Sequence, residues 1–80
     1  MSFHTIFVLI DALGVAKVSQ ALDPNAALDE LRHCGLSGEM YACVLSEAAA
    51  TEINATVQPS KALTLCKRYS HSMMKCADIT

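Results

Sequence analysis

The two halves of this chain carry the same residue pattern at an offset of 35 positions, and no gap is needed to align them. Three of the aligned pairs are identical: Pro24 with Pro59, Ala27 with Ala62, and Leu28 with Leu63. A repeat of this length constrains the architecture more than any single motif, because each copy is expected to be one supersecondary unit. The chain has 80 residues, enough for one modest hydrophobic core. We therefore expect a single domain over residues 1–80, made of two units at about 4–35 and 39–76.

The first unit begins with a predicted β-hairpin. Residues 5–10 are β-branched, aromatic and aliphatic, a composition that is typical of a buried strand. Asp11 and Gly14 then indicate a turn. From residue 16 to residue 22 the side chains roughly alternate between apolar and polar, as in a strand with one solvated face. The two strands are expected to pair antiparallel.

Each unit is then expected to end in a helix. Asp23 is a good N-cap residue, and the proline after it suits the first helical position, where its missing N–H is not needed. This helix is predicted over 24–34, with Gly35 free to adopt the left-handed conformation that ends helices. In the second unit, Pro59 opens a predicted helix that runs to about residue 75.

The second unit also contains two predicted strands. Residues 40–45 are continuously apolar, and residues 51–57 alternate between apolar and polar. The alanine run at 48–50 favours helix instead, so an all-α bundle remains the alternative. The repeat favours the strand, because it predicts a turn at 47–50. Two ββα units side by side give an α+β fold, with a four-stranded antiparallel sheet and two helices on one face.

The composition predicts a folded protein without a membrane segment. The hydrophobic fraction is 52% and the charged fraction is 18%, well outside the range of disordered chains. The apolar run at 6–10 is short, is interrupted by Asp11 and has no basic segment before it, so it does not read as a signal peptide. No segment reaches the roughly 18 apolar residues of a membrane span. We expect a cytoplasmic protein whose four cysteines stay reduced.

Residues 6–14 resemble the strand that delivers a metal-binding aspartate in the alkaline-phosphatase superfamily. The resemblance implies that Asp11 would enter a metal site at the end of that strand. It covers only these nine residues, the fold of that family is several times longer than this chain, and no matching aspartate and histidine ligands follow. The sequence therefore favours a hairpin turn at Asp11.

The cysteine and histidine residues do not predict a metal or catalytic site. The cysteines lack the short paired spacing of zinc sites. Cys66, His71 and Cys76 are each five residues apart, which places them on different faces of a helix. His33 and Cys34 are adjacent, so on a helix they point about 100° apart and cannot form a nucleophile–base pair. We expect no metal, no cofactor and no enzymatic activity.

The charge is distributed unevenly along the chain. Residues 1–58 carry seven acidic and two basic side chains, whereas residues 59–80 carry four basic and one acidic. The polar face of the second predicted helix forms a candidate partner-binding strip: Lys61, Thr64, Lys67, Arg68, His71 and Lys75. Such a strip suits an acidic protein surface or a nucleic-acid backbone. The net charge of −2 and the few aromatic residues favour a protein partner over nucleic acid.

The predicted sheet offers a second candidate surface. If both helices cover one face, alternate apolar residues of the first strand lie on the open face. The candidates for this sheet face or for a homodimer interface are Ile6, Phe7, Val8, Leu9 and Ile10. An exposed edge strand offers a further route, by adding a strand of a partner or of a second copy.

These features favour a small non-enzymatic protein-binding module or stoichiometric inhibitor. In size and general layout the chain is similar to the small inhibitors carried by phages and mobile elements, including anti-CRISPR proteins. We expect the protein to act by stoichiometric occlusion of a protein partner, through the open sheet face or the basic helix. A nucleic-acid-associated regulator that uses the basic second helix is the alternative, and a structural homo-oligomer subunit is a third.

Overall fold

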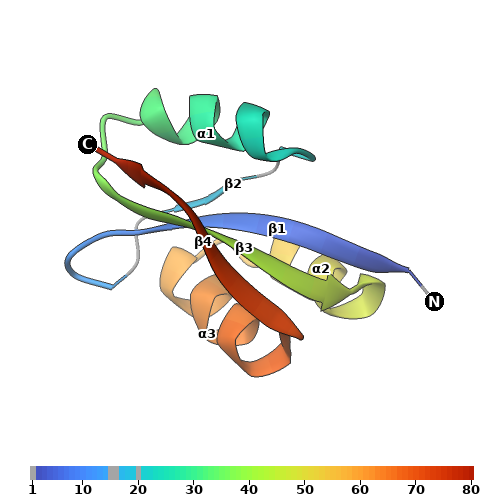
Figure 1. Ribbon diagram of the computed structural model, residues 1–80. Coiled ribbons are helices and arrows are strands. Elements are labelled where there is room, and N and C mark those ends of the chain that lie inside the picture. Colours follow the sequence, from blue (N-terminus) through green and yellow to red (C-terminus); the bar gives the residue numbers. More distant parts are fainter. Residues whose placement is uncertain (1, 15–16, 20) are drawn as a thin grey trace.

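The computed structural model describes residues 2–14, 17–19 and 21–80. The elements are, in chain order, β1 (Phe3–Ile10), β2 (Lys17–Ser19), α1 (Pro24–Arg32), β3 (Gly38–Ser46), α2 (Glu47–Asn54), α3 (Pro59–Tyr69) and β4 (Ser72–Ile79). The four strands form one antiparallel sheet in the order β2-β1-β3-β4, with β1 and β3 in the middle (Figure 1). The predicted α+β class and the four-stranded antiparallel sheet are confirmed.

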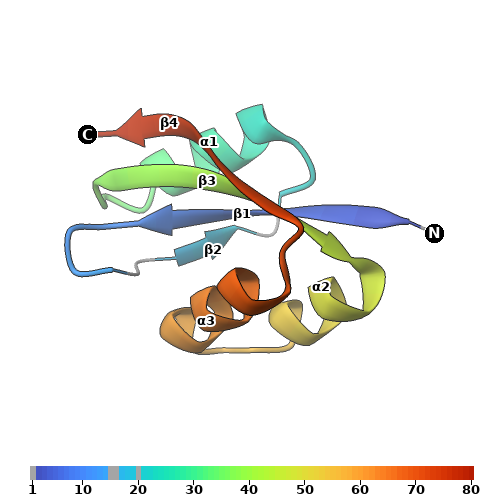
Figure 2. The same cartoon turned by 60° about the horizontal axis from the view of Figure 1, so that its bottom comes forward.

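Helices cover both faces of this sheet, where we expected two helices on one face. On one face, α1 packs on Phe7, Leu9 and Met40. On the other face, α2 and α3 pack on a second cluster that includes Ile6 and Leu45 (Figure 2). The physical reason is the continuous apolar character of β1 and β3, because alternate side chains of a strand point to opposite faces and each face then needs a cover.

The local signals of the first unit act as the sequence predicts. The Asp11 carboxylate accepts a hydrogen bond from the Leu13 N–H at 2.9 Å, which closes the turn after β1. The Asp23 carboxylate accepts one from the Ala26 N–H at 2.9 Å and caps α1. Gly35 has a φ of 71° and lies just beyond the end of α1. The predicted second strand is confirmed for Lys17–Ser19, whereas Ala16 and Gln20 lie outside the described residues.

The predicted strand at 51–57 is wrong, because α2 occupies Glu47–Asn54. The Ser46 hydroxyl accepts a hydrogen bond from the Ala49 N–H at 3.3 Å and caps the helix. Ala49, Ala50 and Ile53 are buried on one side of α2. Ile53 follows Ala50 by three residues and Ala49 by four, which is the spacing of one face of a helix. The strong helix propensity of the alanine run therefore decides this segment.

The second predicted helix is shorter than expected and gives way to a strand. α3 ends at Tyr69, and residues 72–79 form β4 at the edge of the sheet. β4 pairs with β3 from Ser72 opposite Val44 to Ile79 opposite Gly38. A longer helix would leave this side of β3 without hydrogen-bond partners, and unpaired backbone groups of this kind are costly.

Candidate functional site

The face of the sheet that carries α1 is covered over only one of its halves. α1 has nine residues and is about 14 Å long, whereas the eight-residue strand β1 is about 26 Å long. α1 lies over the end of β1, and the start of β1 extends beyond it (Figure 1). The uncovered residues on this face form what we call the open half-face: Phe3, Thr5, Ala42, Val44 and Met74.

Two large apolar side chains stand out on the open half-face. Phe3 is 56% exposed and Met74 is 66% exposed. The Phe3 ring lies edge-on to the His71 ring, with the ring centroids 5.0 Å apart. The backbone N–H of His71 donates a hydrogen bond to the Val44 carbonyl at 2.8 Å, so this predicted binding residue is held beside the open half-face. Sequence reasoning missed Phe3 and Met74, and the only signal was their apolar character outside the predicted core.

β4 adds a free strand edge to this surface. It is the last strand in the sheet order, and among the described residues no further strand pairs with its outer edge. After Met74, β4 carries Lys75, whose Nζ lies 2.7 Å from a Glu39 carboxylate oxygen and 2.8 Å from an Asp78 oxygen. A bulge leaves Cys76 between Lys75 and Ala77 without its own partner on β3. Charged side chains and bulges hinder edge pairing, so the accessible part is Ser72–Met74, which we call the open edge.

Lys75 is therefore in a different place from the one the sequence predicted. It lies on a strand and is ion-paired, whereas we expected it on the outer face of the second helix. The contacts with Asp78 and then Glu39 raise the pKa of its ammonium group above the ordinary value. Its charge is thus already balanced within the sheet, which leaves Lys75 with little role in binding an anionic partner.

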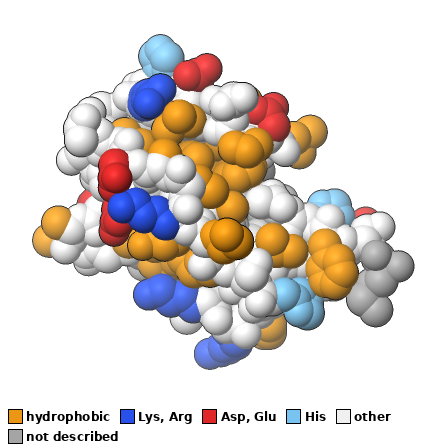
Figure 3. Space-filling model, in the orientation of Figure 1, with side chains coloured by type: hydrophobic (Ala, Val, Ile, Leu, Met, Phe, Trp, Pro, Cys, Tyr) orange, Lys and Arg blue, Asp and Glu red, His pale blue; other side chains and the backbone are white. Residues whose placement is uncertain are grey.

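The other predicted basic residues lie on α3. Lys61, Thr64, Lys67 and Arg68 are all solvent-exposed. The Thr64 hydroxyl donates to the Ser60 carbonyl at 3.0 Å. Lys67 and Arg68 belong to the last turn of α3, next to the start of β4. Figure 3 shows hydrophobic side chains across the middle of the face that carries β4, with Lys and Arg side chains below them over α3.

The predicted sheet-face residues of β1 are not available as a surface. Ile6, Phe7, Val8 and Leu9 are buried, and Ile10 is half-buried. This prediction is wrong because it assumed one bare face, whereas helices lie over these residues on both sides of the sheet.

Two cysteine thiols lie in the core. Cys43 and Cys66 are buried between β3 and α3. The pKa of Cys43 is raised above its ordinary value, mainly by the hydrogen bond with the Cys66 thiol and in addition by burial. The Cys43 thiol therefore stays protonated. In the described part of the chain, no three metal-ligating side chains come together.

A group of polar side chains joins β2 to α1. The Lys17 ammonium donates a hydrogen bond to the Cys34 sulfur at 3.1 Å, and this contact raises the pKa of Lys17. The buried Ser19 hydroxyl donates to the Glu30 carboxylate and accepts from the Ala21 N–H at 3.1 Å. These contacts satisfy the polar groups beneath α1 and hold the helix in place.

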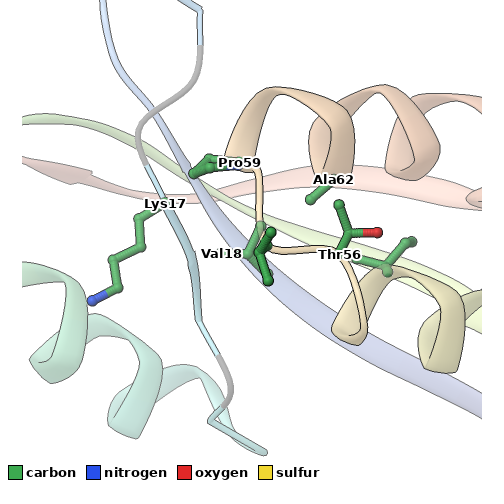
Figure 4. A pocket seen from close by; sticks show the side chains of 7 residues that line it. Lys17, Val18, Thr56, Pro59 and Ala62 are labelled. Carbon is green, nitrogen blue, oxygen red and sulfur yellow. The ribbon is translucent and has the colours of Figure 1, made fainter.

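A cavity of about 210 Å³ lies between β2, α2 and α3. Figure 4 shows its lining, in which the Lys17 amino group points away from the cavity toward α1. The Thr56 hydroxyl is used in a hydrogen bond to the Glu52 carbonyl at 3.0 Å. The remaining lining residues are apolar: Val18, Ile53, Val57, Pro59 and Ala62. The cavity therefore offers an apolar wall rather than an acid, a base or a nucleophile.

Comparison of this chain with protein-family models, with curated proteins and with solved structures finds no match. Among the described helices, none has the length and apolar character that crossing a bilayer requires. The open half-face, the open edge and the last turn of α3 are thus the features from which a function has to be inferred.

Proposed function

We propose that this protein is a small non-enzymatic protein-binding module that acts by stoichiometric occlusion of a partner protein. The binding surface consists of the open half-face and the open edge. The observation that carries the proposal is the pairing of exposed apolar side chains, above all Met74, with a strand edge that is free within the described residues.

The two parts of this surface supply complementary contributions to binding. A strand added at the open edge gains backbone hydrogen bonds, and its side chains then lie over the neighbouring half-face. Burial of apolar surface contributes about 25 cal/mol for each Å² removed from water. Phe3 and Met74 are large and exposed, so within the open half-face their burial contributes most to the binding free energy. The residues of this surface belong to β1, β3 and β4, which pair with one another, so binding requires little further ordering of the backbone.

The proposal is tested by affinity capture with the wild-type chain and two variants. Met74→Arg places a charge at the centre of the surface, and it is expected to abolish capture of the specific partner. Leu13→Arg is the matched control, because Leu13 is 95% exposed and follows the far end of β1. Both variants should show the circular dichroism spectrum of the wild type. Equal capture of the same partner by Met74→Arg and wild type would refute the proposal.

A further inference from the structure

We infer that the partner presents an extended segment of alternating apolar and acidic side chains, which pairs with Ser72–Met74 as an additional strand of the sheet. This inference rests on the proposed function and specifies the chemistry of the partner. It follows from what lies on each side of the open edge.

A strand added beside β4 directs its side chains alternately to the two faces of the sheet. Met74 pairs with Ala42, and both lie on the face that carries α1. Met73 pairs with Cys43 and packs against the core under α2 and α3. Neighbouring positions of the added strand therefore meet two different environments.

On the α1 side, the added strand meets the open half-face. Met74 is mostly exposed there, and Ala42 and Val44 behind it are half-buried. The side chains of Met74, Ala42 and Val44 offer no hydrogen bond, so a charged side chain of the partner placed over them would lose water without gaining one. An apolar side chain is the one that fits.

On the α3 side, the added strand meets positive charge. The Ser70 N–H donates to the Cys66 carbonyl at 2.9 Å and the His71 N–H to the Val44 carbonyl, so the chain passes directly from the end of α3 into the sheet. Lys67 and Arg68 lie in the last turn of α3, a few residues before the start of β4, and both are exposed. Carboxylates of the partner on this side complement them and speed association.

A second copy of this chain fits the same edge less well. In antiparallel self-pairing centred on Met74, Lys75 of the second copy stands opposite Met73, so the side chain at this position is a lysine and not an acidic residue. The bulge at Cys76 also interrupts the longer pairing that two β4 strands would need.

The inference is tested by titrating the isotope-labelled full chain with two synthetic peptides of about eight residues, the length of a typical strand. One peptide alternates valine with glutamate, and the other alternates valine with lysine. The glutamate peptide is expected to shift the amide resonances of Ser72, Met73 and Met74 and to bind about tenfold more tightly than the lysine peptide. Equal binding of the two peptides, no binding by either, or shifts confined to other residues would overturn the inference.

Charge reversal provides the matched variants. Lys67→Glu combined with Arg68→Glu is expected to remove the preference for the glutamate peptide, whereas Lys61→Glu, at the other end of α3, is expected to keep it. All three residues are exposed, so circular dichroism should show a wild-type fold. An unchanged preference in the double variant would overturn the inference, as would a wild-type dimer formed through Ser72–Met74 in analytical ultracentrifugation.

The two levels of the proposal fail in different ways. If Met74→Arg abolishes capture of the partner but the glutamate peptide does not bind, the binding surface stands and the alternating acidic segment is wrong. If Met74→Arg captures the partner as well as wild type does, the surface itself is wrong and the inference falls with it.

Discussion

Replacement of Leu31 by alanine tests the packing that defines the proposed binding surface. The Leu31 side chain has no exposed area and packs in the cluster formed by α1, β1, β3 and β4. Truncation of such a leucine costs about 2–5 kcal/mol, because transfer energy is lost and a cavity is left. A domain of this length has a total stability of about 4–12 kcal/mol. One substitution thus removes a large part of the free energy of unfolding.

The assay is thermal unfolding followed by circular dichroism. Each kcal/mol shifts the midpoint of a small domain by about 4–8 °C, so Leu31→Ala is expected to lower it by at least about 8 °C. Leu13→Ala is the control, with an expected shift of no more than a few degrees for an exposed turn residue. A small shift for Leu31→Ala would mean that α1 does not cover this half of the sheet. The division into a covered half and an open half-face would then be refuted.

Two further predictions concern the edge strand and the thiols. Lys75→Val removes the ion-paired cation that hinders pairing at the edge of β4. It is expected to cause self-association that rises with protein concentration in sedimentation velocity runs. A strict monomer at every concentration would contradict this role of Lys75. An aromatic disulfide reagent is expected to modify Cys34 and Cys76 in the native protein, with Cys43 and Cys66 reacting only after unfolding, because these two are buried and Cys43 stays protonated. Rapid modification of all four thiols without denaturant would show that the core between β3 and α3 is open.

The elements that sequence patterns predicted correctly depend on interactions within a few residues. Asp23 caps α1 through an amide three positions later, and Asp11 closes its turn through an amide two positions later. Such contacts form wherever the chain goes, so the sequence alone is enough to predict them. The exposure of Lys67 and Arg68 on the outer face of a helix was predictable for the same reason.

Two features that sequence patterns missed, β4 and the open half-face, are decided by distant partners, whereas α2 follows from the local helix propensity of the alanine run. The alternation at 51–57 is compatible with a strand and equally with an amphipathic helical turn. The buried position of Ile53 is expected in either structure. The seven-residue spacing of Lys61, Arg68 and Lys75 is helical, yet Lys75 lies in a strand because β3 needs a second neighbour. The open half-face depends on the short reach of α1 along the sheet, which only the assembled layers define.

The position of β4 in the chain has a consequence for when the proposed binding surface forms during synthesis. β4 follows every other described element in sequence, and both Met74 and the open edge belong to it. While the chain is being synthesised, β1, β2 and the three helices emerge first, and β3 has an unpaired side until β4 arrives. Synthesis of β4 therefore completes the described sheet and creates the proposed binding edge in one event, so a nascent chain that has not yet reached β4 is expected not to capture the partner.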